Sequence, residues 1–139
     1  MAQIGSTRHL DKAKDLELGW SAVVRANGVL YLAGISSVDD SEEESFAVGI
    51  GEPVAQINRI YDTMEQVLAL YGATLEHVVR ETIFMTGEPE LYAEAFEARK
   101  QRYAFCELPA TAGCRVVELD TPGTLLEVVA TAVDPASVS

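Results

Sequence analysis

Cysteine and basic residues are both scarce in this 139-residue chain. Its two cysteines, Cys106 and Cys114, are too few for a disulfide framework, which favours a reducing, cytoplasmic setting. Only 10 Lys and Arg stand against 22 Asp and Glu, and the net charge of −12 repels nucleic acids and anionic membrane surfaces. Because no basic stripe offsets this repulsion, neither a nucleic-acid partner nor a membrane partner is expected.

Long apolar runs are also missing. None reaches the length of a membrane span, and the first 19 residues lack the apolar core of a secretory signal. The chain is nevertheless 48% hydrophobic, which predicts an ordered core rather than disorder. Its length predicts one domain over residues 1–139.

Motifs for metals and nucleotides are missing as well. His9 and His77 stand without HxxxH, CxxC or a carboxylate cluster, so we interpret them as ordinary histidines. Gly49 and Gly51 lack the lysine of a phosphate-binding loop. The sequence therefore predicts no metal and no organic cofactor.

The first half of the chain contains β-prone and helical patterns. Ser21–Arg25 and Val29–Ala33 flank an Asn27-Gly28 pair, which predicts a β-hairpin. The acidic segment 39–45 is interpreted as a solvated loop. From Pro53 to Tyr71 the apolar residues recur at helical spacing, with proline at the start and Gly72 at the end.

The second half continues with Val78–Met85 as a strand and Glu90–Tyr103 as a helix. Pro109–Val133 then reads as two apolar strands joined at Pro122-Gly123, which predicts a second hairpin. The order ββ–α–β–α–ββ predicts a two-layer α+β fold with both helices on one face of the sheet. The other face needs a cover, and self-association would supply it.

Two charges interrupt the apolar C-terminal strands. Glu127 lies on an apolar stripe of Leu125–Val133, where loss of water would suit it to general acid or base catalysis. The alternative is a structural ion pair, for example with Arg115. Cys114 is a weak candidate nucleophile, and a small buried core thiol is the alternative.

Four segments resemble the Rid family, the YjgF-like reactive-intermediate deaminases. Gly19–Ser21 and Asn27–Gly34 resemble the family's opening aromatic-Ser pair and its strand ending in glycine. Gln56–Gly87 is similar to its helix, Gly-Ala turn and VV.TT.F strand. Pro109-Ala110 resembles the entry to the site strand, and LLEVVATAV the closing strand.

The resemblance implies a chorismate-mutase-like fold assembled as a homotrimer with a central barrel and a site in each cleft between subunits. Family members hydrolyse enamines or imines without a cofactor, so a small-molecule substrate is implied. Glu127 matches the glutamate that handles water. Trp20, Ser21 and Gly34 match site positions, although a core aromatic and a strand cap are the alternative roles of the first two.

One family residue is missing: Thr111 stands where the family has its substrate-clamping arginine, in PATAGC rather than PARS.C. Thr111, Gly113 and Arg115 share one face of an extended strand, so we hypothesise that Arg115 takes over anion binding. Pairing of Arg115 with Glu118, Glu127 or a partner-subunit acid is the alternative. Cys114 lies one residue from the family's site cysteine.

These residues predict a Rid-like hydrolase or deaminase acting on a small imine, enamine or related metabolite. The predicted catalytic residues are Glu127 and Arg115, and the predicted substrate-binding residues are Trp20, Ser21, Gly34, Thr111, Gly113 and Cys114. The alternative is a non-catalytic trimer that binds small metabolites or has a regulatory role. Ribonuclease activity, also attached to this family, is opposed by the charge of −12.

Overall fold

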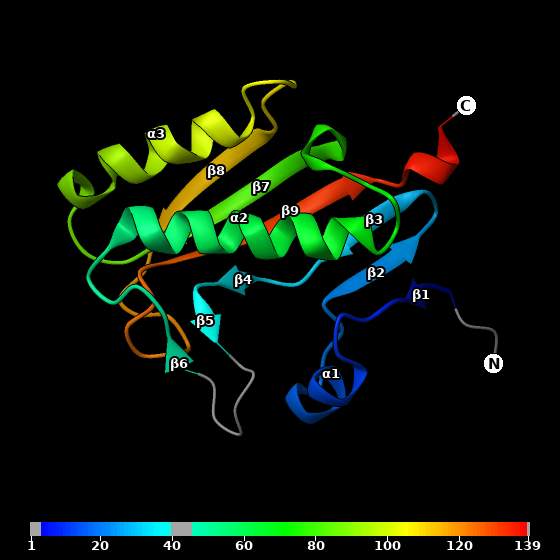
Figure 1. The fold of residues 1–139 in the computed structure, drawn as a ribbon, viewed down its shortest axis with the longest axis horizontal. Helices are drawn as coiled ribbons and strands as arrows, with labels where there is room; N and C mark the ends of the chain where they lie inside the picture. Colours follow the sequence, from blue (N-terminus) through cyan, green and yellow to red (C-terminus); the bar gives the residue numbers. More distant parts are fainter. Residues whose placement is uncertain (1–3, 40–45, 139) are drawn as a thin grey trace.

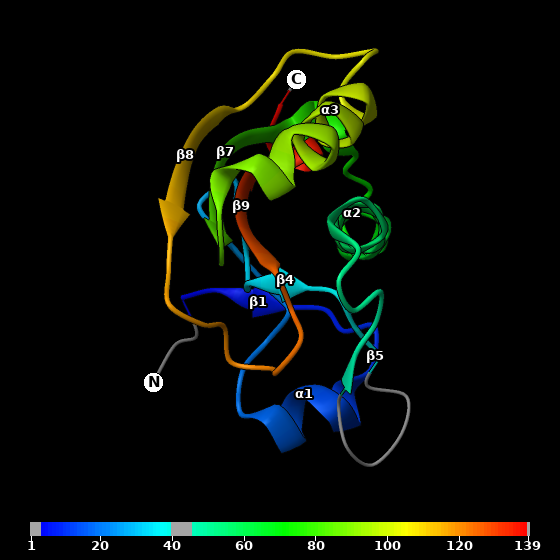
Figure 2. The same cartoon turned by 90° about the vertical axis from the view of Figure 1, so that its left-hand side faces the viewer.

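The computed structural model describes residues 4–39 and 46–138, and within them α2 and α3 cover one face of a mixed sheet (Figures 1 and 2). The seven-stranded sheet has the order β1-β2-β3-β9-β7-β8, with β4 also paired to β9. The strands are β1 Ser6–Thr7, β2 Val23–Ala26, β3 Val29–Leu32, β4 Ile35–Ser36, β7 Val78–Met85, β8 Ala110–Arg115 and β9 Leu126–Val133. The helices are α1 Lys12–Leu18, α2 Pro53–Ala69 and α3 Ala93–Arg102.

Most predicted elements are confirmed. The first hairpin pairs β2 with β3 around Asn27 and Gly28, whose φ angles of 50° and 77° suit the turn. The strand Val78–Met85 has the predicted bounds. The helix from Pro53 ends at Ala69, and the second helix is shorter than predicted because its first turn, Pro89–Tyr92, is a 3-10 helix. The sequence did not predict α1.

The second hairpin prediction is wrong. β8 pairs in parallel with β7, whereas β9 pairs antiparallel with β7 on its other side, so β7 separates them. The reason is that α3 carries the chain across one face, and such a crossover returns the chain parallel to its starting strand. β8 is the sheet edge and all six of its residues are exposed, contrary to the expectation of a buried strand.

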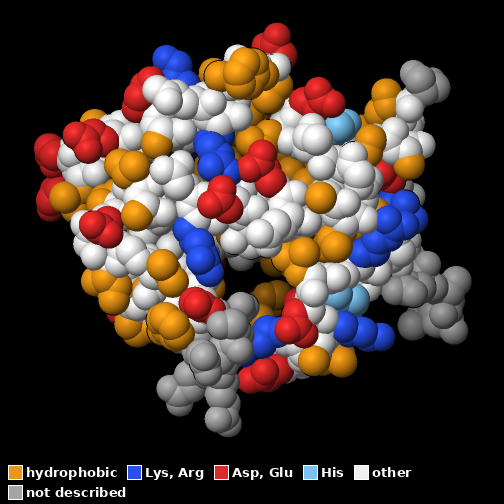
Figure 3. Space-filling view, viewed as in Figure 1, with side chains coloured by type: hydrophobic (Ala, Val, Ile, Leu, Met, Phe, Trp, Pro, Cys, Tyr) orange, Lys and Arg blue, Asp and Glu red, His pale blue; other side chains and the backbone are white. Residues whose placement is uncertain are grey.

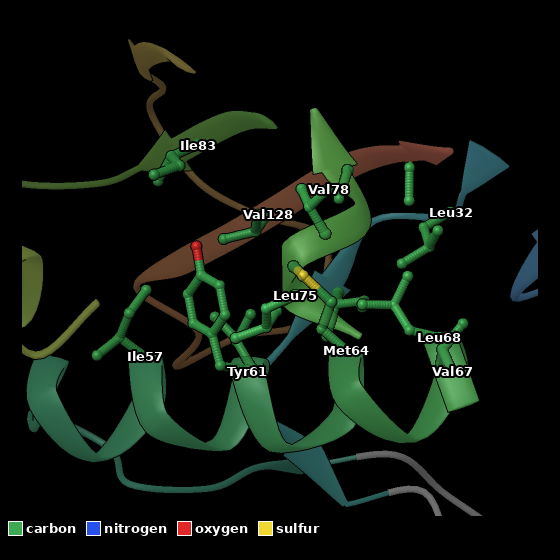
Figure 4. Packing of buried hydrophobic residues seen from close by; sticks show 14 of the residues in the cluster. Leu32, Ile57, Tyr61, Met64, Val67, Leu68, Leu75, Val78, Ile83 and Val128 are labelled. Atoms are coloured by element: carbon green, nitrogen blue, oxygen red, sulfur yellow. The ribbon is translucent and has the colours of Figure 1, made fainter. Parts of the chain in front are cut away.

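The core lies between α2 and the strands β7 and β9 (Figure 4). The inward stripe of α2 is fully buried and consists of Gln56, Ile57, Ile60, Tyr61, Met64, Val67 and Leu68. Alternate residues of β9 meet this stripe: Leu126, Val128, Ala130 and Ala132. An irregularity in β7 between Val78 and Arg80 buries Val78 and leaves Val79 exposed, although the sequence pattern predicts Val79 on the same side as Ile83 and Met85, which are buried.

The opposite face, here called the open face, has no helix of the described residues against it (Figure 2). Tyr31 is half exposed there, and the outward residues of β9 are only partly buried: Glu127, Val129, Thr131 and Val133. A sheet with one bare, largely apolar face is typical of a protein that self-associates.

The acidic loop predicted at 39–45 lies outside the described residues except for Asp39. This residue ends β5 (Val38–Asp39), which pairs with β6 (Phe46–Ala47). Within the described parts of the chain, no helix has the length and apolar character needed to cross a membrane.

Candidate functional site

Glu127 lies on the open face in a row of four residues from four neighbouring strands. Ser36 of β4 and Phe84 of β7 lie directly opposite Glu127, and Cys114 of β8 lies directly opposite Phe84. Directly opposed residues point to the same face, and adjacent strands are about 4.8 Å apart. These four residues, which we call the site row, therefore place a hydroxyl, a carboxylate, an aromatic ring and a thiol side by side.

Gly34 contacts the glutamate. A Cβ atom on Gly34 would lie 2.9 Å from both Cδ and Oε1 of Glu127, so only glycine leaves room for the carboxylate in this position. Ser21 lies nearby, because the Ala33 amide donates to the Ala22 carbonyl at 2.9 Å and extends the β2–β3 ladder toward Gly34. Trp20, the next residue back, is 54% exposed.

The environment of Glu127 alters its acidity. Burial raises the pKa of its carboxyl group, and the negative charge of Asp120 raises this pKa further. A carboxylate with a raised pKa holds and releases protons closer to neutral pH, as general base catalysis requires. The electrostatics thus suit Glu127 to the role predicted for it.

Asp120 belongs to the connection between β8 and β9, which forms an open cavity of about 730 Å³. The residues that line the cavity are Thr86 and the continuous segment Val117–Leu125. Fully buried Gln56 holds this segment: its Nε2 donates to the carbonyls of Gly49 (3.1 Å) and Gly123 (2.9 Å). Its Oε1 accepts a hydrogen bond from the Leu125 amide at 2.7 Å, so both polar atoms of the side-chain amide are hydrogen-bonded.

Thr111, Gly113 and Arg115 share a face, as predicted, but it is the helix side of the sheet. Thr111 lies opposite buried Glu81, and Arg115 lies opposite Met85. Glu127 points the other way, so the ion pair with Arg115 considered from the sequence does not form within one chain. Arg115 Nη2 instead donates to the Gly87 carbonyl at 2.6 Å and lies 3.8 Å from the Glu88 carboxylate.

Cys114 does not occupy the core. It is exposed on the open face, so the interpretation as a buried core thiol is wrong. The reason is the edge position of β8, since neither face of this strand is covered by the described part of the chain. The structure therefore places Gly34 against Glu127 and Cys114 on the same face two strands away, whereas Thr111, Gly113 and Arg115 face the other side of the sheet.

A buried polar network lies on the helix side, behind the site. Glu81 of β7 is 1% exposed and accepts hydrogen bonds from the Tyr61 hydroxyl at 2.8 and 2.9 Å and from the Tyr103 hydroxyl. Arg99 of α3 donates to the same carboxylate through Nε at 3.0 Å and Nη2 at 2.7 Å. Tyr61 extends from α2 with its hydroxyl toward the sheet (Figure 4).

This network also reaches the start of β8, because Arg99 Nη2 donates to Thr111 Oγ1 at 2.9 Å. Burial raises the pKa values of both Tyr61 and Tyr103, and the charge of Glu81 raises them further. Burial alone would lower the pKa of Arg99, but its contacts with Tyr61 and Glu81 outweigh that effect and raise it. Arg99 is thus a fixed cation whose charge is balanced by Glu81.

The sequence pattern does not assign the buried network or two members of the site row, Ser36 and Phe84, although signals for the network are present. Glu81 falls on the same predicted face as Ile83 and Met85, which marks a carboxylate directed at the core. Arg99 and Tyr103 fall on the inner stripe of the second helix. Ser36 and Phe84 had no comparable signal, because their role depends on which strands become neighbours.

The chain matches the sequence model of a known protein family. The family model described as Endoribonuclease L-PSP matches residues 12–134. The chain belongs to this family, which is the Rid or YjgF family. It is a divergent member, and its α+β architecture is the one found in solved relatives.

Three relatives show how far this sequence has diverged from other members of the family. The 3-aminoacrylate deaminase RutC of Acinetobacter baylyi is 27% identical over 115 residues, which cover 78% of this chain and 81% of that protein. Rv2704 from Mycobacterium tuberculosis, a member of the YjgF/YER057c/UK114 family, has a structure that matches this one with a TM-score of 0.74 at 26% identity. The match covers 93% of this chain and 98% of Rv2704. YyfA of Yersinia pestis has a TM-score of 0.73 at 22% identity, covering 82% and 86%.

Proposed function

We propose that this protein hydrolyses a small imine or enamine, with Glu127 activating the water. The observation that carries the proposal is the Glu127 carboxylate itself: it lies on the open face, against Gly34, with a raised pKa. A family relative that bears the name 3-aminoacrylate deaminase supports this class of reaction.

The chemistry needs one proton acceptor beside an electrophilic carbon. Glu127 takes a proton from water as the water oxygen bonds to the carbon of C=N, and the π electrons move to nitrogen. The same carboxyl group then returns this proton to nitrogen, which gives the carbinolamine R₂C(OH)NH₂. Glu127 next moves the hydroxyl proton to nitrogen, so that the C–N bond breaks as C=O forms and ammonia leaves. The balance is R₂C=NH + H₂O → R₂C=O + NH₃, and an enamine enters after tautomerising to the imine.

We place the site in a cleft between subunits of a homotrimer with a central barrel. The bare open face and the exposed edge strand β8 support an assembly that covers both. Three chains of 15.0 kDa give about 45 kDa, which native mass spectrometry or light scattering will measure. A monomeric mass at micromolar concentration would remove the inter-subunit site from the proposal.

Three predicted site residues have roles that follow from this placement. Trp20 and Ser21 would form a wall of the cleft near Gly34. Arg115 can hold a substrate anion only toward the site of an adjacent subunit, because it faces away from Glu127 of its own chain. An Arg115→Ala variant with unchanged activity and ligand affinity would eliminate that role.

The test is hydrolysis of 2-aminoacrylate and 3-aminoacrylate by the wild type and by Glu127→Gln. We expect the variant to lose at least about 100-fold in kcat/KM on whichever compound the wild type hydrolyses, in keeping with removal of a general base. Equal rates for both proteins would show that Glu127 is not the base.

The second candidate is a non-catalytic trimer that binds small metabolites. It is favoured by Thr111, which the sequence resemblance aligns with the family's clamp and whose hydroxyl accepts a hydrogen bond from Arg99. Ligand binding without turnover of any imine would support this candidate. Ribonuclease activity is not proposed, because acidic and basic side chains intermix on the helix side (Figure 3) and the net charge is −12.

A further inference from the structure

The cavity formed by the β8–β9 connection, which leads into the strand of Glu127, has an unusual charge for a site expected to receive an amino-acid derivative. Of the described residues that line it, two are acidic, Glu118 and Asp120, and none is Lys, Arg or His. Its last lining residue, Leu125, lies two positions before Glu127 on the chain. Three carboxylates therefore lie along about ten residues at this end of the sheet.

The arginines of the sheet do not line the cavity. The strands contain three arginines, and two of them, Arg25 and Arg115, lie opposite inward-facing Leu30 and Met85. Arg80 is on the open face but lies four residues from Phe84 along β7, roughly 13 Å from the site row. Arg99 approaches β8 from the helix side and is neutralised by Glu81.

The cavity is also fixed in place rather than loosely formed. The hydrogen bonds of buried Gln56 hold Gly123 and Leu125, and Thr124 Oγ1 donates to the Thr121 carbonyl at 2.6 Å. A segment that is held in this way keeps Asp120 in place at small entropic cost, and such preorganisation favours selective binding. Asp120 affects Glu127 directly, since its charge contributes to the electrostatics of that carboxyl.

We propose that this cavity selects substrates that carry a positive charge and no carboxylate, namely alkyl iminium ions derived from amines, with Asp120 as the residue that determines specificity. The inference rests on the proposed function, because it names the substrate class for the same site. The reaction is R₂C=NH₂⁺ + H₂O → R₂C=O + NH₄⁺. Asp120 stabilises the cationic end, and Glu127 takes the proton from water.

Binding of two non-reactive probes tests the specificity apart from the chemistry. 3-Methylbutylammonium and 3-methylbutanoate have the same alkyl chain and opposite charges. We expect calorimetric titration of the wild type to show at least about tenfold tighter binding of the ammonium, a difference of about 1.4 kcal/mol. Asp120→Asn should weaken ammonium binding roughly two- to fivefold, as expected for loss of one solvent-exposed charge pair.

The matched control is Glu97→Gln on the exposed side of α3, which changes the net charge equally but lies outside the cavity. It should bind both probes as the wild type does. Equal or tighter binding of the carboxylate by the wild type, or an equal effect of the two substitutions, would overturn the inference.

Turnover is measured separately with imines made in the assay from 3-methylbutylamine by an amine oxidase and from leucine by an amino-acid oxidase, with semicarbazide as the competing trap. We expect the amine-derived imine to be hydrolysed preferentially and Asp120→Asn to reduce that preference. Ammonium-selective binding without hydrolysis of either imine would contradict the proposed function and support the specificity. Hydrolysis with preference for the leucine imine would support the function and overturn the specificity.

Discussion

Replacement of Arg99 by methionine should be among the most destabilising single changes in this protein. The Glu81 side chain has no exposed surface, and Arg99 supplies two of its hydrogen bonds and its counter-charge. Without the arginine, a buried carboxylate keeps only the hydroxyls of Tyr61 and Tyr103. Removal of one partner of a buried ion pair costs about 3–5 kcal/mol, and we expect Arg99→Met to fall in this range.

The same substitution elsewhere on α3 provides the control. Arg102 also forms two ion pairs, with Asp62 at 2.7 Å and Glu65 at 2.6 Å, but both carboxylates are at least half exposed. Pairs of this kind contribute about 0–1 kcal/mol, so Arg102→Met should have a small effect. The comparison isolates burial of the charge, because the residue type, the replacement and the helix are identical.

The assay is urea denaturation followed by circular dichroism, at one fixed protein concentration because oligomers gain stability with concentration. In a separate thermal denaturation, a cost of 3–5 kcal/mol corresponds to a fall of roughly 10–15 °C in Tm for a chain of this size. The double variant Glu81→Met/Arg99→Met should be less destabilised than the sum of its single variants, because it leaves no unpaired charge. Equal costs at Arg99 and Arg102, or additive effects in the double variant, would refute the argument.

Four other predictions concern the site and its support. Gly34→Ala should lower activity at least about tenfold while changing the free energy of unfolding by less than about 1 kcal/mol. The flexible carboxyl end of Glu127 can move away from the new methyl group, but it then no longer occupies its catalytic position. Steady-state kinetics measures the first effect and urea denaturation the second. Gln56→Ala should cost about 2–4 kcal/mol and increase amide hydrogen exchange at Leu125, since it leaves buried partners unpaired; unchanged exchange would contradict the role assigned to Gln56. Tyr61→Phe and Tyr103→Phe should leave the tyrosinate absorbance that develops before alkaline unfolding unchanged, because both hydroxyls stay protonated in the folded protein. Glu127→Gln should be slightly more stable than the wild type at pH 7 and lose that advantage by about pH 4, which denaturation at both pH values will show. The folded-state pKa of Glu127 is raised, so the stabilisation that its protonated form gives is fully present below the unfolded-state pKa of about 4.3. This stabilisation is lost as pH rises through the folded-state pKa.

The local sequence pattern predicts the positions of the helices and strands better than it predicts which strands pair with each other. The Asn27-Gly28 turn and the strand Val78–Met85 depend on residues close in the chain, and both were found at the predicted positions. The pairing of β8 depends on the path of α3, which no local pattern records, so a parallel edge strand was taken for half of a hairpin. The same error placed Arg115 beside Glu127, when β7 lies between their strands and their side chains face opposite sides.

The contact of Thr111 with Arg99 bears on the charge of the proposed site. Thr111 faces the helix side, where its hydroxyl accepts from Arg99, so the cation nearest the start of β8 is held within the buried network. Its charge is already balanced by Glu81, and little of it remains to attract a carboxylate on the open face. On our proposal, the negative charge of Asp120 gives this site a preference for cationic substrates, and Glu127 is the group that activates water.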